Sequence, residues 1–166
     1  CIVLLYFNPI FDGKTLQQHD VLQYQGMAKE ALDFEEQTGE PQLWTNSMFG
    51  GMPTYLIRIT THNAVQYIHK LFHTTYQHPQ MFAIMYLVCF FLALLLIDVP
   101  IWLAMLGALF YGFSTYFYII IEAGHMTKAA ALGYMPLVIA AIYATYMQGK
   151  TILGTSIFSL TLSLQL

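Results

Sequence analysis

The sequence has few charged residues and few cysteines, and each scarcity narrows the class of protein. Only 9% of the 166 residues are charged, whereas 57% are hydrophobic. Soluble domains carry about a quarter charged residues, so this balance, with long apolar runs, indicates an integral membrane protein. The formal net charge of -3 indicates neither nucleic-acid binding nor a polybasic lipid-binding segment.

Cysteine is restricted to Cys1 and Cys89. Cys89 lies in the middle of an apolar run, so the sequence does not favour a disulfide between them. A lipid-modified Cys1 is also disfavoured, because the residues after it are apolar and offer no polar tether. The chain starts without Met and stops within an apolar run, which predicts a piece of a longer multi-pass protein.

Several motifs of catalysis are missing. The sequence contains no HExxH zinc motif, no GxxxxGK[ST] phosphate loop and no GxSxG nucleophile motif. His69 and His73 have the i, i+4 spacing of zinc ligands, but no HExxH pattern and no nearby cysteine supports a zinc site there. We interpret them as part of the polar, water-facing side of an amphipathic helix over about 63–76.

The apolar runs predict an all-α integral membrane protein, a polytopic helix bundle. Residues 1–11 are interpreted as the end of a first transmembrane helix, which Asn8-Pro9 terminates. Turn signals at Asp98-Val99-Pro100 and Gln148-Gly149-Lys150 separate later runs. Pro136 is expected to kink one of them. The expected transmembrane helices cover 81–97, 101–121, 129–147 and 151–166.

Residues 12–80 form a polar loop, which is expected to be extracytoplasmic and helical in part. Residues 12–55 hold seven of the nine carboxylates. A helix is expected to begin with Asp20 as its N-cap and to stop at Gly39-Glu40-Pro41. The aromatic segment from Trp44 to Tyr55 is turn-rich and is expected to pack against something or to lie at the membrane surface.

Counting the spans places this loop and the 122–128 connector on one side of the membrane, and the two short turns on the other. Asp20, Glu122 and His125 would then share one face. Two carboxylates and an imidazole could bind a divalent metal, or act as base and stabiliser. The alternative is structural: a helix cap for Asp20, a solvated pair of Glu122 and Lys128, and a hydrogen-bonded His125.

The order of these features resembles the YfhO family of bacterial membrane proteins, which in turn is similar to the GT-C class of glycosyltransferases. The resemblance rests on an aspartate soon after the first span, the W-x-N-x-x-x-G-G-x-P-x-Y segment and the EAGH connector. The residues that carry it are Asp20, Val21 to Gln25, Trp44-Thr45-Asn46, Gly50-Gly51-Met52-Pro53 and Glu122 to His125. It covers most of the chain and implies a GT-C-like bundle in the bacterial inner membrane.

The resemblance further implies transfer of a sugar from a polyprenyl-phosphate carrier to an extracytoplasmic glycan, lipid or protein. Asp20 would be the base, completed by Glu122 and His125. Lys128 and Arg58 would pair with the phosphate. Because His19, and not a second acid, precedes Asp20, the motif departs from a DxD or ExD pattern. A divalent cation, Mg²⁺ or Mn²⁺, held by Asp20, Glu122 and His125 is therefore implied only weakly.

Two readings without catalysis stay open. A transporter or flippase for lipid-linked sugars would carry ionisable groups and broken helices near the middle of the membrane. The runs from 81 to 147 have almost no internal charge, which favours chemistry at the membrane surface. A structural subunit of a larger membrane complex would instead use the segment from Trp44 to Tyr55 as a docking surface.

Overall fold

A computed structural model describes residues 2–10, 14, 16–57, 67 and 79–165 of the chain. The chain divides into two compact units. We call Cys1–Gln17 with Ala64–Leu166 the bundle unit, and Gln18–Asn63 the loop unit. The described residues are mostly α-helical, with one short pair of strands, so the predicted all-α class is confirmed.

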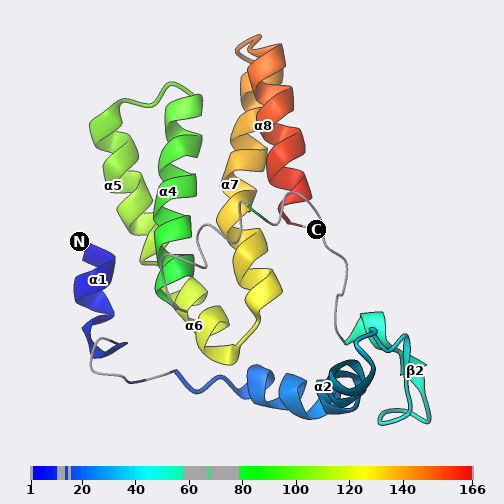
Figure 1. Cartoon of the computed structure of the whole chain (residues 1–166). Helices are drawn as coiled ribbons and strands as arrows, with labels where there is room; N and C mark the ends of the chain where they lie inside the picture. The colour runs from blue at the N-terminus through cyan, green and yellow to red at the C-terminus, as the bar shows by residue number, and fades with distance from the viewer. Residues whose placement is uncertain (1, 11–13, 15, 58–66, 68–78, 166) are drawn as a thin grey trace. The chain divides into compact units, whose positions relative to one another are not determined.

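Antiparallel helices joined by short turns build the bundle unit (Figure 1). Helix α4 packs against both α5 and α7, and α8 packs on the other side of α7. A short helix, α1, also contacts α4 and is followed by the 3-10 turn η1. The bounds are α1 Ile2–Tyr6, η1 Asn8–Ile10, α4 Gln80–Leu96, α5 Ile101–Gly112, α6 Thr115–Ala123, α7 Met126–Tyr146 and α8 Thr151–Ser163.

The core of the bundle unit lies where the first half of α4 meets α6 and α7. Met81, Phe82 and Met85 of α4 are almost fully buried there. Two tyrosine hydroxyls in this region donate to backbone carbonyls of α7. Tyr86 Oη donates to Ala129 O over 3.0 Å, and Tyr111 Oη donates to Leu132 O over 2.8 Å. These hydrogen bonds satisfy polar groups that would be costly to bury alone.

The expected helix over 101–121 is divided in the structure. Helices α5 and α6 meet at Phe113-Ser114 and are bent by 43° relative to each other. Ser114 has an extended backbone (φ -64°, ψ 128°) and forms the N-cap of α6, so the helical hydrogen bonding stops there. A continuous apolar run thus does not give one continuous helix.

Only α7, among the described helices, is by itself long and apolar enough to cross a membrane. It runs without a break through Pro136. The bent pair of α5 and α6 passes the same test when the two are taken together. Helices α4 and α8 are apolar but shorter, with 17 and 13 residues.

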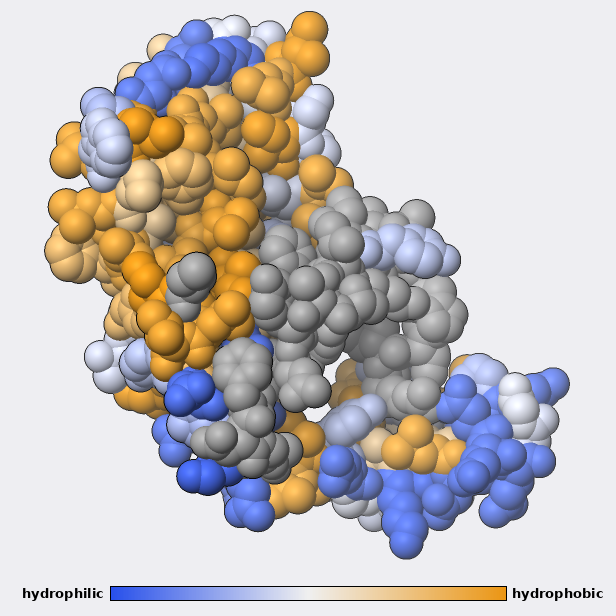
Figure 2. Space-filling view, turned by 60° about the vertical axis from the view of Figure 1, so that its left-hand side comes forward, coloured by the Kyte–Doolittle hydropathy of each residue, from blue (hydrophilic) through white to orange (hydrophobic). Residues whose placement is uncertain are grey.

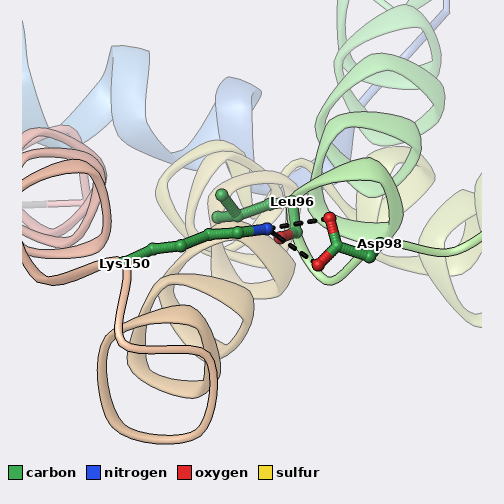
Figure 3. A network of polar contacts seen from close by, with 3 residues as sticks. All are labelled: Leu96, Asp98 and Lys150. Atoms are coloured by element: carbon green, nitrogen blue, oxygen red, sulfur yellow. Dashed lines mark hydrogen bonds and ion pairs between the residues drawn. The ribbon is translucent and has the colours of Figure 1, made fainter.

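The two short turns lie at the same end of the bundle unit. Their place on one side of a membrane stays a prediction. Asp98 and Gly149 adopt left-handed backbone angles (φ 62° and 67°) that reverse the chain. Lys150 Nζ lies 2.8 Å from Asp98 Oδ1 and also donates to Leu96 O over 3.1 Å (Figure 3). One ammonium group therefore joins the turn between α7 and α8 to the C-terminal end of α4, where a cation is favoured.

The loop unit contains a long helix, α2, from His19 to Thr38. Its N-cap is Gln18, and Asp20 lies in the first turn, so the prediction that Asp20 caps this helix is wrong. An acidic side chain in the first turn still favours the helix through the macrodipole. The predicted end is confirmed: Gly39 is left-handed (φ 74°), and its amide donates to Glu35 O over 2.8 Å.

After α2, the chain forms a small hairpin. Strands β1 (Trp44–Thr45) and β2 (Met52–Pro53) pair in antiparallel register, and the 3-10 turn η2 (Thr54–Leu56) follows. Three residues in a row, Phe49 to Gly51, have positive φ angles. A side chain at Gly51 would lie 2.7 Å from Trp44 Nε1, so only glycine allows the indole of Trp44 to rest there.

Candidate functional site

A cavity of about 300 Å³ opens in the bundle unit beside the 122–128 connector. Its wall comes from the end of α1 and the segment after it, from Pro79 at the N-cap of α4 and from α6. Most of the lining is apolar or aromatic, with one cation and one carboxylate. The lining residues are Tyr6, Phe7, Pro9, Lys14, Leu16, Pro79, Tyr118, Ile121 and Glu122. Its size is at the lower end of the range for small-molecule sites.

Aromatic rings pack around one side of this cavity. The ring centroids of Tyr6 and Tyr118 are 5.3 Å apart, and those of Tyr6 and Phe113 are 5.5 Å apart. These separations are typical of attractive aromatic pairs. The hydroxyl of Tyr118 is buried and has no hydrogen-bond partner among the described residues. A buried hydroxyl without a partner is costly, and a polar group bound in the cavity could satisfy it.

Two charged side chains of opposite sign reach the cavity. Lys14 belongs to the connector after η1, and Glu122 belongs to the last turn of α6. Both residues are exposed, so they meet water at the mouth of an otherwise apolar pocket. This combination suits an amphiphile whose polar head carries a phosphate, hydroxyl groups or both.

The remaining predicted residues of the connector surround this site without lining it. Gly124 is left-handed (φ 93°), and His125 then forms the N-cap position of α7 with an exposed side chain. Lys128 Nζ lies 5.7 Å from the ring centroid of Tyr116, a cation–π contact. To bind a phosphate as predicted, Lys128 would have to give up this contact with Tyr116. Lys14, which the sequence analysis did not select, lines the cavity.

Two predicted site residues are not among the described residues of the bundle unit. Asp20 belongs to the loop unit, in the first turn of α2. Arg58 lies outside the described residues, as do His69 and His73 and all of the expected helix over 63–76 except Tyr67. The structure therefore brings Glu122 to a cavity, and the predicted meeting of Asp20 with Glu122 and His125 stays a prediction.

A second polar cluster, which the sequence analysis missed, centres on Glu30 of α2. Its Oε1 accepts hydrogen bonds from Gln42 Nε2 (3.0 Å) and the Asn46 amide (3.2 Å), and its Oε2 accepts one from Thr45 Oγ1 (2.7 Å). These donors, led by Thr45, lower the pKa of the Glu30 carboxyl to about 2. The cluster is a structural link between α2 and β1. Its contacts are 12 to 16 residues apart, and no local pattern signals them.

The ligands predicted for a divalent cation do not form a cluster among the described residues. In the part of the chain that the structure describes, no three His, Cys, Asp or Glu side chains lie close enough to hold a metal ion together. A protein site for Mg²⁺ or Mn²⁺ needs several oxygen ligands at one point, or a substrate phosphate to complete them.

Comparisons with known protein family models, curated proteins and solved structures find no match to this chain.

Proposed function

We propose that the bundle unit is embedded in a lipid bilayer as a multi-pass helical domain. The support is the position of its apolar side chains. Large hydrophobic residues on several helices are highly exposed, among them Trp102, Phe110 and Ile152. Figure 2 shows hydrophobic surface along the bundle and hydrophilic residues gathered at its upper end, where the turns lie in Figure 1. A protein in water rarely leaves so much apolar surface uncovered, whereas lipid chains would cover it.

Given this membrane location, we propose that the protein is a membrane glycosyltransferase of GT-C type that uses a polyprenyl-phosphate sugar. The observation that carries the proposal is the place of Glu122. It is a carboxylate that the resemblance selects, and it lines a cavity with Lys14 and a group of aromatic rings. The resemblance also favours a bacterial inner membrane, with residues 12–80 on its outer side.

Each wall of the cavity would have a distinct task. Lys14 would pair with the phosphate that links sugar and lipid. The aromatic rings of Tyr6 and Tyr118 would contact the apolar face of the sugar, and the Tyr118 hydroxyl would gain a hydrogen-bond partner. Glu122 would accept hydrogen bonds from sugar hydroxyls. Together these contacts would hold the anomeric carbon at the mouth of the cavity, where an acceptor can approach.

The proposed reaction is a single displacement. The acceptor hydroxyl oxygen attacks the anomeric carbon, the bond from that carbon to the phosphate oxygen breaks, and polyprenyl phosphate leaves with the electron pair. A carboxylate takes the proton of the acceptor hydroxyl. The assignment of this base to Asp20 rests on the resemblance alone. The attack inverts the configuration of the anomeric carbon.

The test is transfer of a radiolabelled sugar from polyprenyl phosphate by the full chain in lipid nanodiscs, with several donors. Glu122→Gln and Asp20→Asn should each lower the transfer rate by roughly 100-fold, the scale of a lost acid–base group or charged contact. Glu36→Gln, a change of an exposed carboxylate that does not line the cavity, is the matched control. Full activity of the Glu122→Gln protein would refute the proposed site.

The bent pair of α5 and α6 supports a second candidate, a transporter for the same class of lipid-linked sugar. Broken helices are a recurring feature of transporter binding sites. Such a protein would move a fluorescent lipid-linked sugar across the bilayer of proteoliposomes without cleaving it. Translocation without transfer would favour this candidate, and transfer with loss in the Glu122→Gln protein would favour the enzyme.

A further inference from the structure

The hairpin of the loop unit exposes several large apolar side chains that the proposed enzyme does not use. Phe49 is 89% exposed, and Trp44 is 52% exposed. Leu43, Tyr55 and Leu56 are also mostly exposed. The Thr54 amide donates to Leu43 O over 3.0 Å, so Leu43, just before β1, lies beside the turn η2, which carries Tyr55 and Leu56.

The hairpin holds these side chains outward through a rigid frame. Glu30 fixes Gln42, Thr45 and Asn46 by hydrogen bonds, and Thr45 is fully buried. Gly51 supports the indole of Trp44 on its other side. Exposure of the apolar groups is therefore built into the local fold and does not follow from a lack of structure.

Phe49 adds a second, independent observation. Its φ angle of 51° lies in the left-handed region, where a bulky residue is strained. Because the ring of Phe49 is exposed, packing within the loop unit does not offset this strain. Strain of this kind at an exposed aromatic tip points to a function outside the unit.

The chemistry of the hairpin identifies the occupant as a lipid headgroup layer. Trp, Tyr and Phe are the residues enriched where protein meets the membrane interface. Residues 41–57 contain no Lys or Arg. Glu35 and Glu36 at the end of α2 and Glu40 just after it add negative charge, so anionic lipids would be repelled. The chain enters the loop unit from the bundle unit and returns to the bundle unit after it.

We infer that the hairpin of residues 43–56 is a surface anchor for a zwitterionic bilayer, with Trp44 and Phe49 entering the headgroup layer. This inference rests on the proposed membrane location of the bundle unit and is independent of the proposed chemistry. Insertion of the aromatic rings would hold the loop unit against the membrane by burying apolar surface that its own fold leaves in water.

The chain has two tryptophans, and one lies in each unit, which makes the test direct. The full chain is placed in phosphatidylcholine nanodiscs with normal or brominated acyl chains. The Trp102→Phe variant reports on Trp44, and the Trp44→Phe variant reports on Trp102. We expect brominated lipid to quench Trp44 fluorescence and aqueous iodide to quench it weakly. Phe49→Ser should weaken the lipid quenching, while Phe34→Ser, which changes an exposed phenylalanine of α2, should not.

The outcomes separate the two proposals. Strong iodide quenching of Trp44, with lipid quenching of Trp102 retained, would overturn the anchor and leave the membrane location of the bundle intact. Quenching of Trp44 by neither agent would also overturn the anchor, since the indole would then be covered by protein. Absence of lipid quenching at both tryptophans would overturn the membrane location as well.

Discussion

Glu30 shows how one side chain can fix the path of the chain after a helix. It has only partial burial, yet its carboxylate collects three donors from Gln42, Thr45 and Asn46. Such charge-assisted hydrogen bonds favour the ionised form, which is why the pKa of Glu30 falls to about 2. The hairpin therefore depends on the charge of a residue that belongs to α2.

This charge predicts a defined pH dependence for the loop unit. The pKa of Glu30 is about 2 when folded and 4.5 as an ordinary carboxyl, so its stabilisation is complete above pH 4.5 and is lost as the pH falls through 2. Glu30→Gln should lower the Tm by roughly a few degrees at pH 7, and the difference from the wild type should shrink below pH 4.5. Thermal unfolding followed by Trp44 fluorescence, in the Trp102→Phe background, measures this.

The control for this series is Glu36→Gln, which removes an exposed carboxylate from the same helix. It should leave the Tm almost unchanged at neutral pH. An equal loss of Tm in both variants would mean that the net charge of α2, and not the hydrogen bonds of Glu30, holds the hairpin.

At the scale of elements, the contact between α7 and α8 depends on a glycine. A methyl group at Gly154 would lie 2.8 Å from Ala141 O and 3.0 Å from the Thr145 nitrogen, both of which are backbone atoms of α7. Small residues at helix crossings allow such close approach. Close packing is important in a membrane, because burial of apolar surface contributes little to helix association there.

Gly154→Ala should therefore destabilise the bundle by about 1–3 kcal/mol, because α8 must move away from α7. The matched control is Gly107→Ala in α5, where the nearest atom is the flexible end of Leu94 at 2.8 Å. That change should be close to neutral. Unfolding in mixed detergent micelles, followed by helical circular dichroism, compares the two. Equal effects would show that helix propensity, and not the α7–α8 contact, decides the result.

Some features of these elements can be predicted from the sequence, and others cannot. Proline, glycine and aspartate predicted the turns at 98–100 and 148–150 and the end of α2 at Gly39, because these residues act through local backbone preferences. The bend between α5 and α6 was missed because hydropathy reports apolar character and not backbone continuity. The contacts of Glu30 and the place of Lys14 in the cavity wall were missed because folding brings their neighbours together. Glu122, which the resemblance selects, lines the same cavity as Lys14, and its role stays a prediction.

For the whole molecule, the ion pair between Lys150 and Asp98 has a consequence for topology. It joins two turns at one end of the bundle unit, and the 122–128 connector belongs to the chain between them. Helix α7 leads from this connector directly to the turn that carries Lys150. If α7 crosses the bilayer, the connector and the two turns must lie on opposite sides of the membrane, with the basic turn favouring the cytoplasm.

Single cysteines in a background without Cys1 and Cys89 test this arrangement in right-side-out vesicles. Thr127→Cys should react at once with a membrane-impermeant maleimide, because Thr127 is exposed in the first turn of α7 on the proposed outer side. Pro100→Cys and Met147→Cys, also at exposed positions, should react only after the membrane is permeabilised. Reaction of the Thr127 and Met147 variants from the same side would mean that α7 does not span the bilayer. The reading of the bundle unit as a multi-pass domain would then fail, and the cavity at Glu122 would have to be explained without a lipid-borne substrate.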